Sequence, residues 1–166
     1  MISRRHWAVW LPALVLLGVA GCASPPQAAR PTEVSQGPWS GRLALQVKDN
    51  ASQSFAAMFE LKGSARTGEL ALTSPLGNTL AVLGWAPGSA TLRSNGRTQQ
   101  FGSVDELVAR ATGSALPVQA LFDWLRGVDT PVPGWRPDLS QLAQGRLAAL
   151  RIEPAPEADL RVILDR

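Results

Sequence analysis

The sequence has 166 residues, 45% of them hydrophobic, which is enough for one domain with its own core. Its 16 basic and 13 acidic side chains leave a net charge of only +3, and without a basic run or an interleaved aromatic stripe this argues against a nucleic-acid partner. The single cysteine, Cys22, excludes a disulfide within the chain.

Residues 1–21 have the pattern of a secretory signal peptide that is cleaved before Cys22. Arg4, Arg5 and His6 form a basic head, residues 7–20 form an apolar run, and small residues stand at the cleavage site. The run is too short for a transmembrane helix, which needs roughly 20 apolar residues. The sequence therefore predicts export.

Residues 19–22, Val-Ala-Gly-Cys, resemble the lipobox of bacterial lipoproteins. The resemblance implies a diacylglycerol on Cys22, linked through a thioether, and an N-acyl chain on the new amino terminus. An aspartate after the cysteine commonly retains such proteins in the inner membrane, and Ala23 gives no such signal. The alternative is an ordinary secreted protein with a cysteine at this place by chance.

Loss of residues 1–21 leaves 145 residues with 14 basic and 13 acidic side chains, a net charge of +1. His6 is the only histidine and leaves with the signal, which excludes Ser-His-Asp and Cys-His catalysis and a His/Cys metal site. Carboxylate-pair chemistry stays open, but acidic residues such as Asp49, Glu69 and Asp105 stand singly. We expect no enzyme, no metal and no cofactor.

Residues 22–38 are predicted to form the lipidated N-terminus and a flexible tether, because they are rich in Pro, Ala, Gln and Ser. The domain follows over residues 39–166. Alternation of apolar and polar residues predicts strands of an antiparallel sheet with one buried face. The predicted strands cover residues 42–48, 55–62, 69–73, 79–85, 90–94, 97–101, 146–152 and 160–165. Residues 79–85 are apolar on both faces, and Asn95-Gly96 predicts a two-residue hairpin.

Two short amphipathic helices interrupt the strands. Ser103 and Glu106 form a capping box that opens the first helix, which ends before Gly113. The second helix begins at Pro117 and ends at Gly127. The predicted fold is mainly β, of the α+β class: a single strongly curved antiparallel sheet whose apolar concave face the helices cover.

Three segments carry a resemblance to a known family: residues 41–44, residues 72–79 and residues 116–127. In this order, behind a lipobox, they resemble the LolB family of outer-membrane lipoprotein receptors over residues 38–128. The resemblance implies an unclosed β-barrel, related in fold to the periplasmic carrier LolA, with helices as a lid over an apolar cavity. It implies a monomer in the inner leaflet of the outer membrane, facing the periplasm of a Gram-negative bacterium. Its partners would be LolA and the acyl chains of cargo lipoproteins, which it would place in that membrane.

The C-terminal part departs from the family pattern. Only about 38 residues follow Gly127, they include Pro131, Pro133 and Pro137, and tyrosine is absent. We therefore expect a hairpin of the barrel to be missing or shortened.

A cavity for acyl chains would be lined by apolar residues of the sheet and of the second helix. The candidates are Leu43, Leu45, Phe55, Phe59, Leu70, Leu72, Val82 and Val162 on the sheet, with Leu121, Phe122 and Trp124 on the lid. The same side chains would equally suit a solid core, so the sequence leaves both open.

Pro75, Leu76 and Gly77 lie in a predicted type I turn that begins at Ser74 and places Leu76 at a surface tip. A single exposed leucine is ordinary in proteins. The resemblance implies a protruding leucine here that delivers lipoproteins into the bilayer.

Two other kinds of protein stay open: an assembly lipoprotein that docks a protein partner, and a tethered binder of small apolar ligands. A hydrolase is a distant third.

Overall fold

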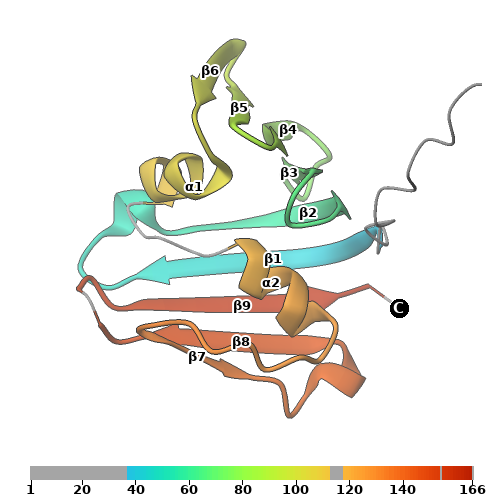
Figure 1. The fold of residues 1–166 in the computed structure, drawn as a ribbon, viewed down its shortest axis with the longest axis vertical. Helices are drawn as coiled ribbons and strands as arrows, with labels where there is room; N and C mark the ends of the chain where they lie inside the picture. The colour runs from blue at the N-terminus through green and yellow to red at the C-terminus, as the bar shows by residue number, and fades with distance from the viewer. Residues whose placement is uncertain (1–36, 113–117, 154, 166) are drawn as a thin grey trace, which may run out of the picture. The chain divides into compact units, whose positions relative to one another are not determined.

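All nine strands of the chain join one antiparallel sheet in the computed structural model, which describes residues 37–112, 118–153 and 155–165 (Figure 1). The strand order is β6-β5-β4-β3-β2-β1-β9-β8-β7. The strands are β1 (Trp39–Val47), β2 (Phe55–Gly63), β3 (Gly68–Thr73), β4 (Thr79–Ala86), β5 (Ser89–Ser94), β6 (Arg97–Phe101), β7 (Trp135–Asp138), β8 (Arg146–Arg151) and β9 (Ala158–Leu164). Short 3₁₀ turns, η1 (Ala51–Gln53) and η2 (Leu142–Gln144), precede β2 and β8. The predicted fold class, mainly β and unclosed, is confirmed.

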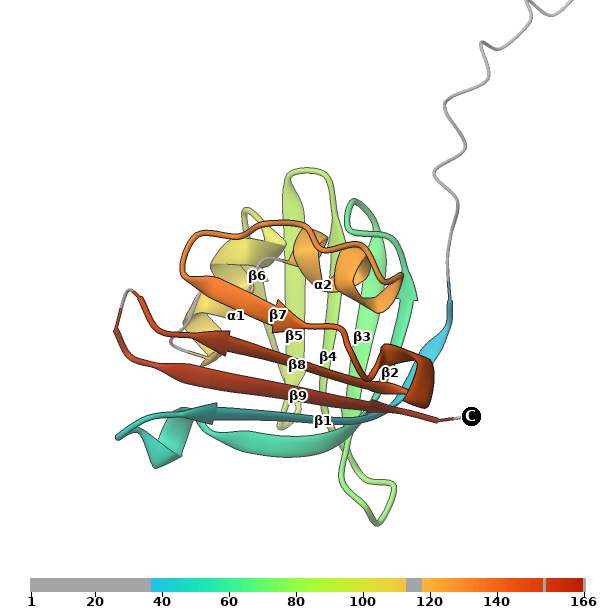
Figure 2. The ribbon, with the colours of Figure 1, turned by 90° about the horizontal axis from the view of Figure 1, so that it is seen from below.

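In the middle of the sheet, β1 pairs on one side with β2 and on the other with β9. Leu43 lies opposite Ala57 of β2 and opposite Val162 of β9, so the two ends of the domain are joined in its middle. Figure 2 shows β3, β4 and β5 running crosswise to β1, β8 and β9. The sheet does not close, since β6 and β7 are its two edges.

Eight of the strands match the predicted segments, and the ninth, β7, was not predicted. Its sequence is Trp-Arg-Pro-Asp, which is too short to establish an alternating pattern and contains Pro137. Proline lacks the N–H that a central strand needs, but it is tolerated at the edge of a sheet, which is where β7 lies. The chain after the second helix thus makes three strands.

The Asn95-Gly96 hairpin is confirmed. Ser94 lies opposite Arg97, so the loop holds two residues, and Asn95 and Gly96 have φ values of 52° and 72°. Positive φ at both positions defines the type I′ turn, whose twist matches that of the strands.

The two helices are α1 (Val104–Thr112) and α2 (Val118–Leu125). Ser103 caps α1, because its Oγ accepts a hydrogen bond of 3.1 Å from the N–H of Glu106. The Glu106 carboxylate in turn accepts from the N–H of Gly102 (3.1 Å), one residue before the position expected in a capping box. Gly113 and Pro117 lie outside the described residues. Within the described ranges, no helix is both long and apolar enough to cross a membrane.

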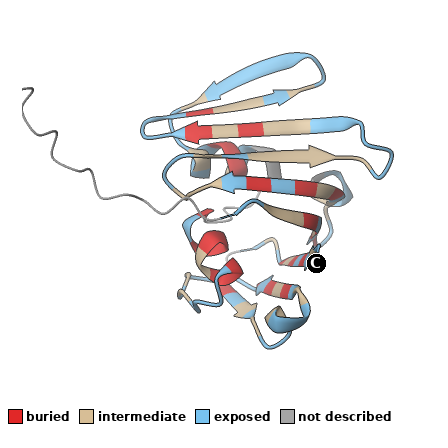
Figure 3. Cartoon of the chain, turned by 90° about the vertical axis from the view of Figure 1, so that its right-hand side faces the viewer, coloured by how far each residue is buried: buried red, intermediate tan, exposed pale blue. Residues whose placement is uncertain are grey.

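Buried residues alternate with more exposed ones along strands such as β1, β8 and β9 and make up most of α2 (Figure 3). The buried positions of a strand therefore lie on one face of the sheet, its inner face. The largest side chains with less than 2% exposure come from both halves of the sheet and from both helices. They are Leu45, Leu61, Leu107, Trp124, Leu160 and Val162.

Candidate functional site

An apolar cavity of about 380 Å³ lies between the inner face of the sheet and the two helices. Among the described residues that line it, all but Ser94 are hydrophobic. The wall is built from five neighbouring strands, β1 to β5, from Leu160 of β9, and from residues of α1 and α2. A concave site with almost no polar groups is suited to an apolar ligand.

Six of the residues proposed from the sequence lie on this wall. They are Leu43, Leu45, Phe55, Leu70, Leu72 and Leu121. The wall also includes Leu83, Trp85, Val104 and Val108, which were not proposed. Val104 and Val108 lie on the apolar side of α1, so helical periodicity would have found them.

Four other candidates lie in the packed core and do not line the cavity: Phe59, Phe122, Trp124 and Val162. The ring of Phe122 meets Trp39 edge-on at 5.5 Å and Trp85 at 6.3 Å between ring centres. Both contacts have the geometry that aromatic quadrupoles favour. Phe122 therefore fixes α2 to the sheet behind the cavity wall.

Val82 lies on the opposite face of β4 from Leu83, because successive side chains alternate along a strand. Its cross-strand neighbours are Ala71 and Arg93 on the outer face. The structure thus places Val82 outside the cavity. The face of Val82 could not be assigned from the sequence, since residues 79–85 are apolar on both faces.

Leu76 is 89% exposed at the tip of the β3–β4 turn. The turn is closed by a hydrogen bond of 2.9 Å from the N–H of Gly77 to the carbonyl of Ser74. Ser74 also donates its N–H to Asn78 (2.8 Å) and accepts from the N–H of Asn78 on its Oγ (3.2 Å). Pro75 and Leu76 occupy the two middle positions, and Gly77 has a φ of 84°. Three hydrogen bonds thus hold the turn, and its tip presents an aliphatic side chain to its surroundings.

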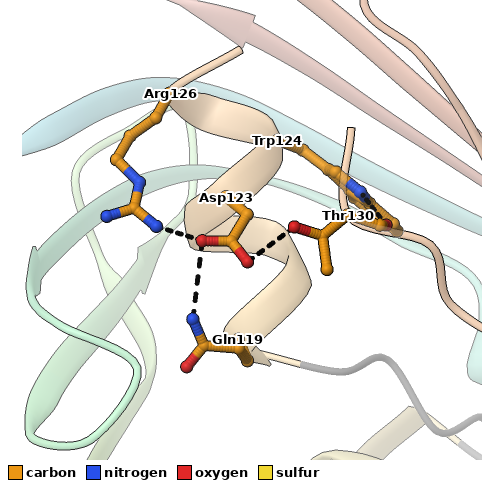
Figure 4. A network of polar contacts seen from close by, with 5 residues as sticks. All are labelled: Gln119, Asp123, Trp124, Arg126 and Thr130. Atoms are coloured by element: carbon orange, nitrogen blue, oxygen red, sulfur yellow. Dashed lines mark hydrogen bonds and ion pairs between the residues drawn. The ribbon is translucent and has the colours of Figure 1, made fainter. Parts of the chain in front are cut away.

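A polar network holds the end of α2 (Figure 4). The carboxylate of Asp123 accepts hydrogen bonds from Thr130 (2.8 Å), Gln119 (3.5 Å) and Arg126. Burial opposes the ionisation of Asp123, but the three donors outweigh it, so the pKa of this carboxyl lies below its usual value. Trp124 donates its indole N–H to the carbonyl of Thr130 (3.0 Å). These contacts attach the chain after α2 back to the helix.

Arg151 places a buried guanidinium on the inner face of β8, away from the cavity wall. It donates a hydrogen bond of 2.6 Å to the carbonyl of Pro156 and lies over the ring of Trp135 at 5.8 Å. Burial lowers the pKa of Arg151. Period-two alternation gives its face, but no feature of the sequence predicts a buried cation there.

The remaining predicted site is Cys22, which lies outside the described residues. Within the described part of the chain, no group of three or more His, Cys, Asp or Glu side chains is placed to hold a metal ion.

Comparison with known proteins gives a consistent result. Residues 38–155 match the family model described as outer membrane lipoprotein LolB. An outer-membrane lipoprotein LolB of Bordetella petrii is 38% identical over 153 residues, which cover 87% of this chain and 75% of the relative. The protein of the same name from Cupriavidus pinatubonensis is 34% identical over 151 residues, covering 89% of this chain and 72% of the relative. The protein of the same name from Chromobacterium violaceum is 34% identical over 131 residues, covering 76% of this chain and 69% of the relative.

Proposed function

Because this chain belongs to the LolB family of outer-membrane lipoproteins, we propose that it accepts lipoproteins from the periplasmic carrier LolA and inserts them into the outer membrane. It is an outer-membrane lipoprotein of Gram-negative type and not an enzyme. We further propose that residues 1–21 are removed, that Cys22 carries the lipid anchor, and that residues 22–38 connect it to a periplasm-facing domain.

The observation that carries the proposal is the apolar cavity next to the two helices. Each methylene of an acyl chain gains roughly 0.8 kcal/mol on leaving water, so a lipoprotein with about three chains cannot cross the periplasm unprotected. A cavity lined almost entirely by Leu, Val, Ala, Phe and Trp provides the required surroundings. Transfer from LolA needs no other energy source if this cavity binds the chains more tightly than the carrier does.

The cavity must widen to hold a complete anchor. A cavity of about 150 Å³ holds benzene, so at the same ratio one of about 380 Å³ holds roughly 15 carbons, or one acyl chain. The helix α1 contributes Val104 and Val108 to the wall, so widening of the cavity on this side would require α1 to shift together with its buried Leu107. The helix α2 is fixed by the Phe122 ring contacts and by the Asp123 network.

A transfer assay tests the proposal. The mature chain with Cys22→Ser is mixed with LolA loaded with a lipoprotein, and the cargo that co-purifies with each protein is measured. Movement of the cargo to this chain is expected, and retention on LolA would refute the receptor role. The Cys22→Ser form should accept cargo as well as the anchored form does, because the cavity lies wholly within the domain.

The cavity volume also favours one other function, a tethered binder of small apolar ligands. Mass spectrometry of the purified chain separates the two. A single free fatty acid per protein, with no uptake of lipoprotein from LolA, would establish the small-ligand function instead.

A further inference from the structure

The two edges of the sheet are protected to different degrees. The edge strand β7 has four residues, and Pro137 removes one of its N–H groups. The other edge, β6, has the sequence Arg-Thr-Gln-Gln-Phe, with no proline, no glycine and a single charge. It is the uppermost strand in Figures 1 and 3, and its side chains are exposed except for the partly buried Phe101. Proteins usually block such an edge, because it pairs readily with another strand.

The register of the β5–β6 hairpin shows which backbone groups of β6 are directed outward. Ser94 and Arg97 flank the two-residue turn and therefore form a hydrogen-bonded pair. Such pairs alternate along an antiparallel ladder, so Arg97, Gln99 and Phe101 bond to β5. Thr98 and Gln100 consequently direct their N–H and C=O groups away from the sheet. Among the described residues, no further strand or backbone contact uses these groups.

This open edge lies beside the apolar cavity. Leu92 and Ser94 of β5 line the cavity, and β6 is the next strand, about 4.8 Å away. Ser94 donates a hydrogen bond of 2.9 Å from its Oγ to the carbonyl of Leu80, and Leu80 is a wall residue with 45% exposure. The exposed side of the wall is therefore at this end of β4 and β5, close to β6.

We infer that β6 pairs with the extended peptide that follows the acylated cysteine of a cargo lipoprotein, and this inference rests on the proposed function. With the acyl chains in the cavity, that peptide begins at the exposed wall beside β5 and β6. Pairing through N–H and C=O groups recognises backbone and not side chains, which suits a receptor for cargo of varied sequence. The uncharged side chains of Thr98, Gln99 and Gln100 impose little selection on the peptide.

Three lipopeptide probes test the inference on the full mature chain. All carry the same triacylated cysteine: the first has no further residues, the second has an eight-residue Ser/Ala peptide, and the third has that peptide with every backbone nitrogen methylated, so that neither edge of the peptide can donate a hydrogen bond. Affinity is measured by displacement of a fluorescent fatty acid from the cavity. The second probe should bind about tenfold more tightly than the first, as two or so added hydrogen bonds would give. The third should bind like the first.

Variants of β6 provide the second arm. Thr98→Pro with Gln100→Pro removes the two outward N–H groups and leaves the bonds to β5, because proline is tolerated where the N–H faces away from a sheet. This variant should lose much of the gain given by the peptide, because only the two outward C=O groups remain, but it should bind the first probe normally, whereas Thr98→Ala with Gln100→Ala should keep the whole gain. Urea unfolding checks that each variant is folded, and the methylated probe tests the unaltered protein independently.

Several outcomes would overturn the inference. One is equal binding of all three probes, and another is a gain that is undiminished in the proline variant or with methylated peptide. A dimer in sedimentation that the proline variant abolishes would assign the edge to a second copy of this chain. If no probe displaces the fatty acid, the proposed function fails and this inference with it.

Discussion

Thr130 donates a hydrogen bond of 2.8 Å from its hydroxyl to the carboxylate of Asp123, seven residues earlier in the chain. The bond closes a loop in which Gly127, with a φ of 80°, turns the chain away from α2. The N–H of Val128 also returns to the carbonyl of Asp123 (2.9 Å). The end of α2 is thereby held against the segment that leads to β7.

Asp123→Ala is expected to lower the free energy of unfolding by roughly 1–2 kcal/mol at pH 7, because Thr130 and Arg126 lose their acceptor. Asp123→Asn keeps an oxygen for Thr130 and should lose less. Urea unfolding of the three proteins measures both differences. Equal stability of the alanine variant and the unaltered chain would contradict the structural role given to this network.

The effect of Asp123 should also depend on pH. Its pKa is lower in the folded chain than in the unfolded chain, where it is about 3.9. Its contribution is therefore fully present above the unfolded pKa and is lost as the pH falls through the folded pKa. The stability difference between the unaltered chain and Asp123→Asn should be constant from pH 7 to about 5 and shrink at lower pH. A stability difference that grows as the pH falls would mean that folding raises the pKa of Asp123 instead of lowering it.

Leu76→Glu should fold normally and accept lipoprotein but fail to insert it, because a carboxylate at the turn tip cannot enter the apolar part of a bilayer. The change in unfolding free energy should stay within about 0.5 kcal/mol. Incorporation of cargo into liposomes measures insertion. Ile163→Glu is the matched control, since Ile163 is 51% exposed on β9, and it should insert cargo normally. Normal insertion by the Leu76 variant would remove the proposed role of the turn.

Filling the cavity should block binding without unfolding the chain. Ala81 lines the cavity, and Ala81→Phe would place a ring in that space with little change in stability, or a small gain. Ala71 lies on the outer face, opposite Val82, and Ala71→Phe is the matched control. Displacement of a fluorescent fatty acid compares the two. The proposal predicts weak binding only for Ala81→Phe, and equal binding by both would mean that ligands occupy another place.

Two truncations distinguish the core from the cavity wall. Phe122→Ala removes a ring that is 3% exposed and touches two tryptophans, so it should lower the free energy of unfolding by about 3–5 kcal/mol. Leu72→Ala removes a partly buried side chain that already borders empty space, and the loss should be smaller. Thermal or urea unfolding measures both. A larger loss for Leu72→Ala than for Phe122→Ala would mean that Leu72 belongs to the packed core and not to the cavity wall.

Much of this architecture follows from local patterns. Alternation located eight strands, and the Asn95-Gly96 pair located a hairpin, because both depend on neighbouring residues only. Strand β7 could not be predicted in this way, since its four residues form a strand through pairing with Arg151 and its neighbours in β8 and not through a pattern of their own. The separation of Leu72 on the cavity wall from Phe122 in the core also depends on tertiary packing, as both are equally apolar in sequence.

The two edge strands of the described sheet, β6 and β7, do not pair with each other, and this has a mechanical consequence. In a closed barrel the hydrogen-bond ladder is a continuous ring, and its circumference cannot grow unless a pair of strands separates. Here the ladder runs from β6 to β7 as an open band, so its curvature can relax through small changes in twist between neighbours while every pair stays bonded. The interior can therefore widen without breaking the hydrogen bonds between strands. Side-chain packing would then be the main resistance to such widening.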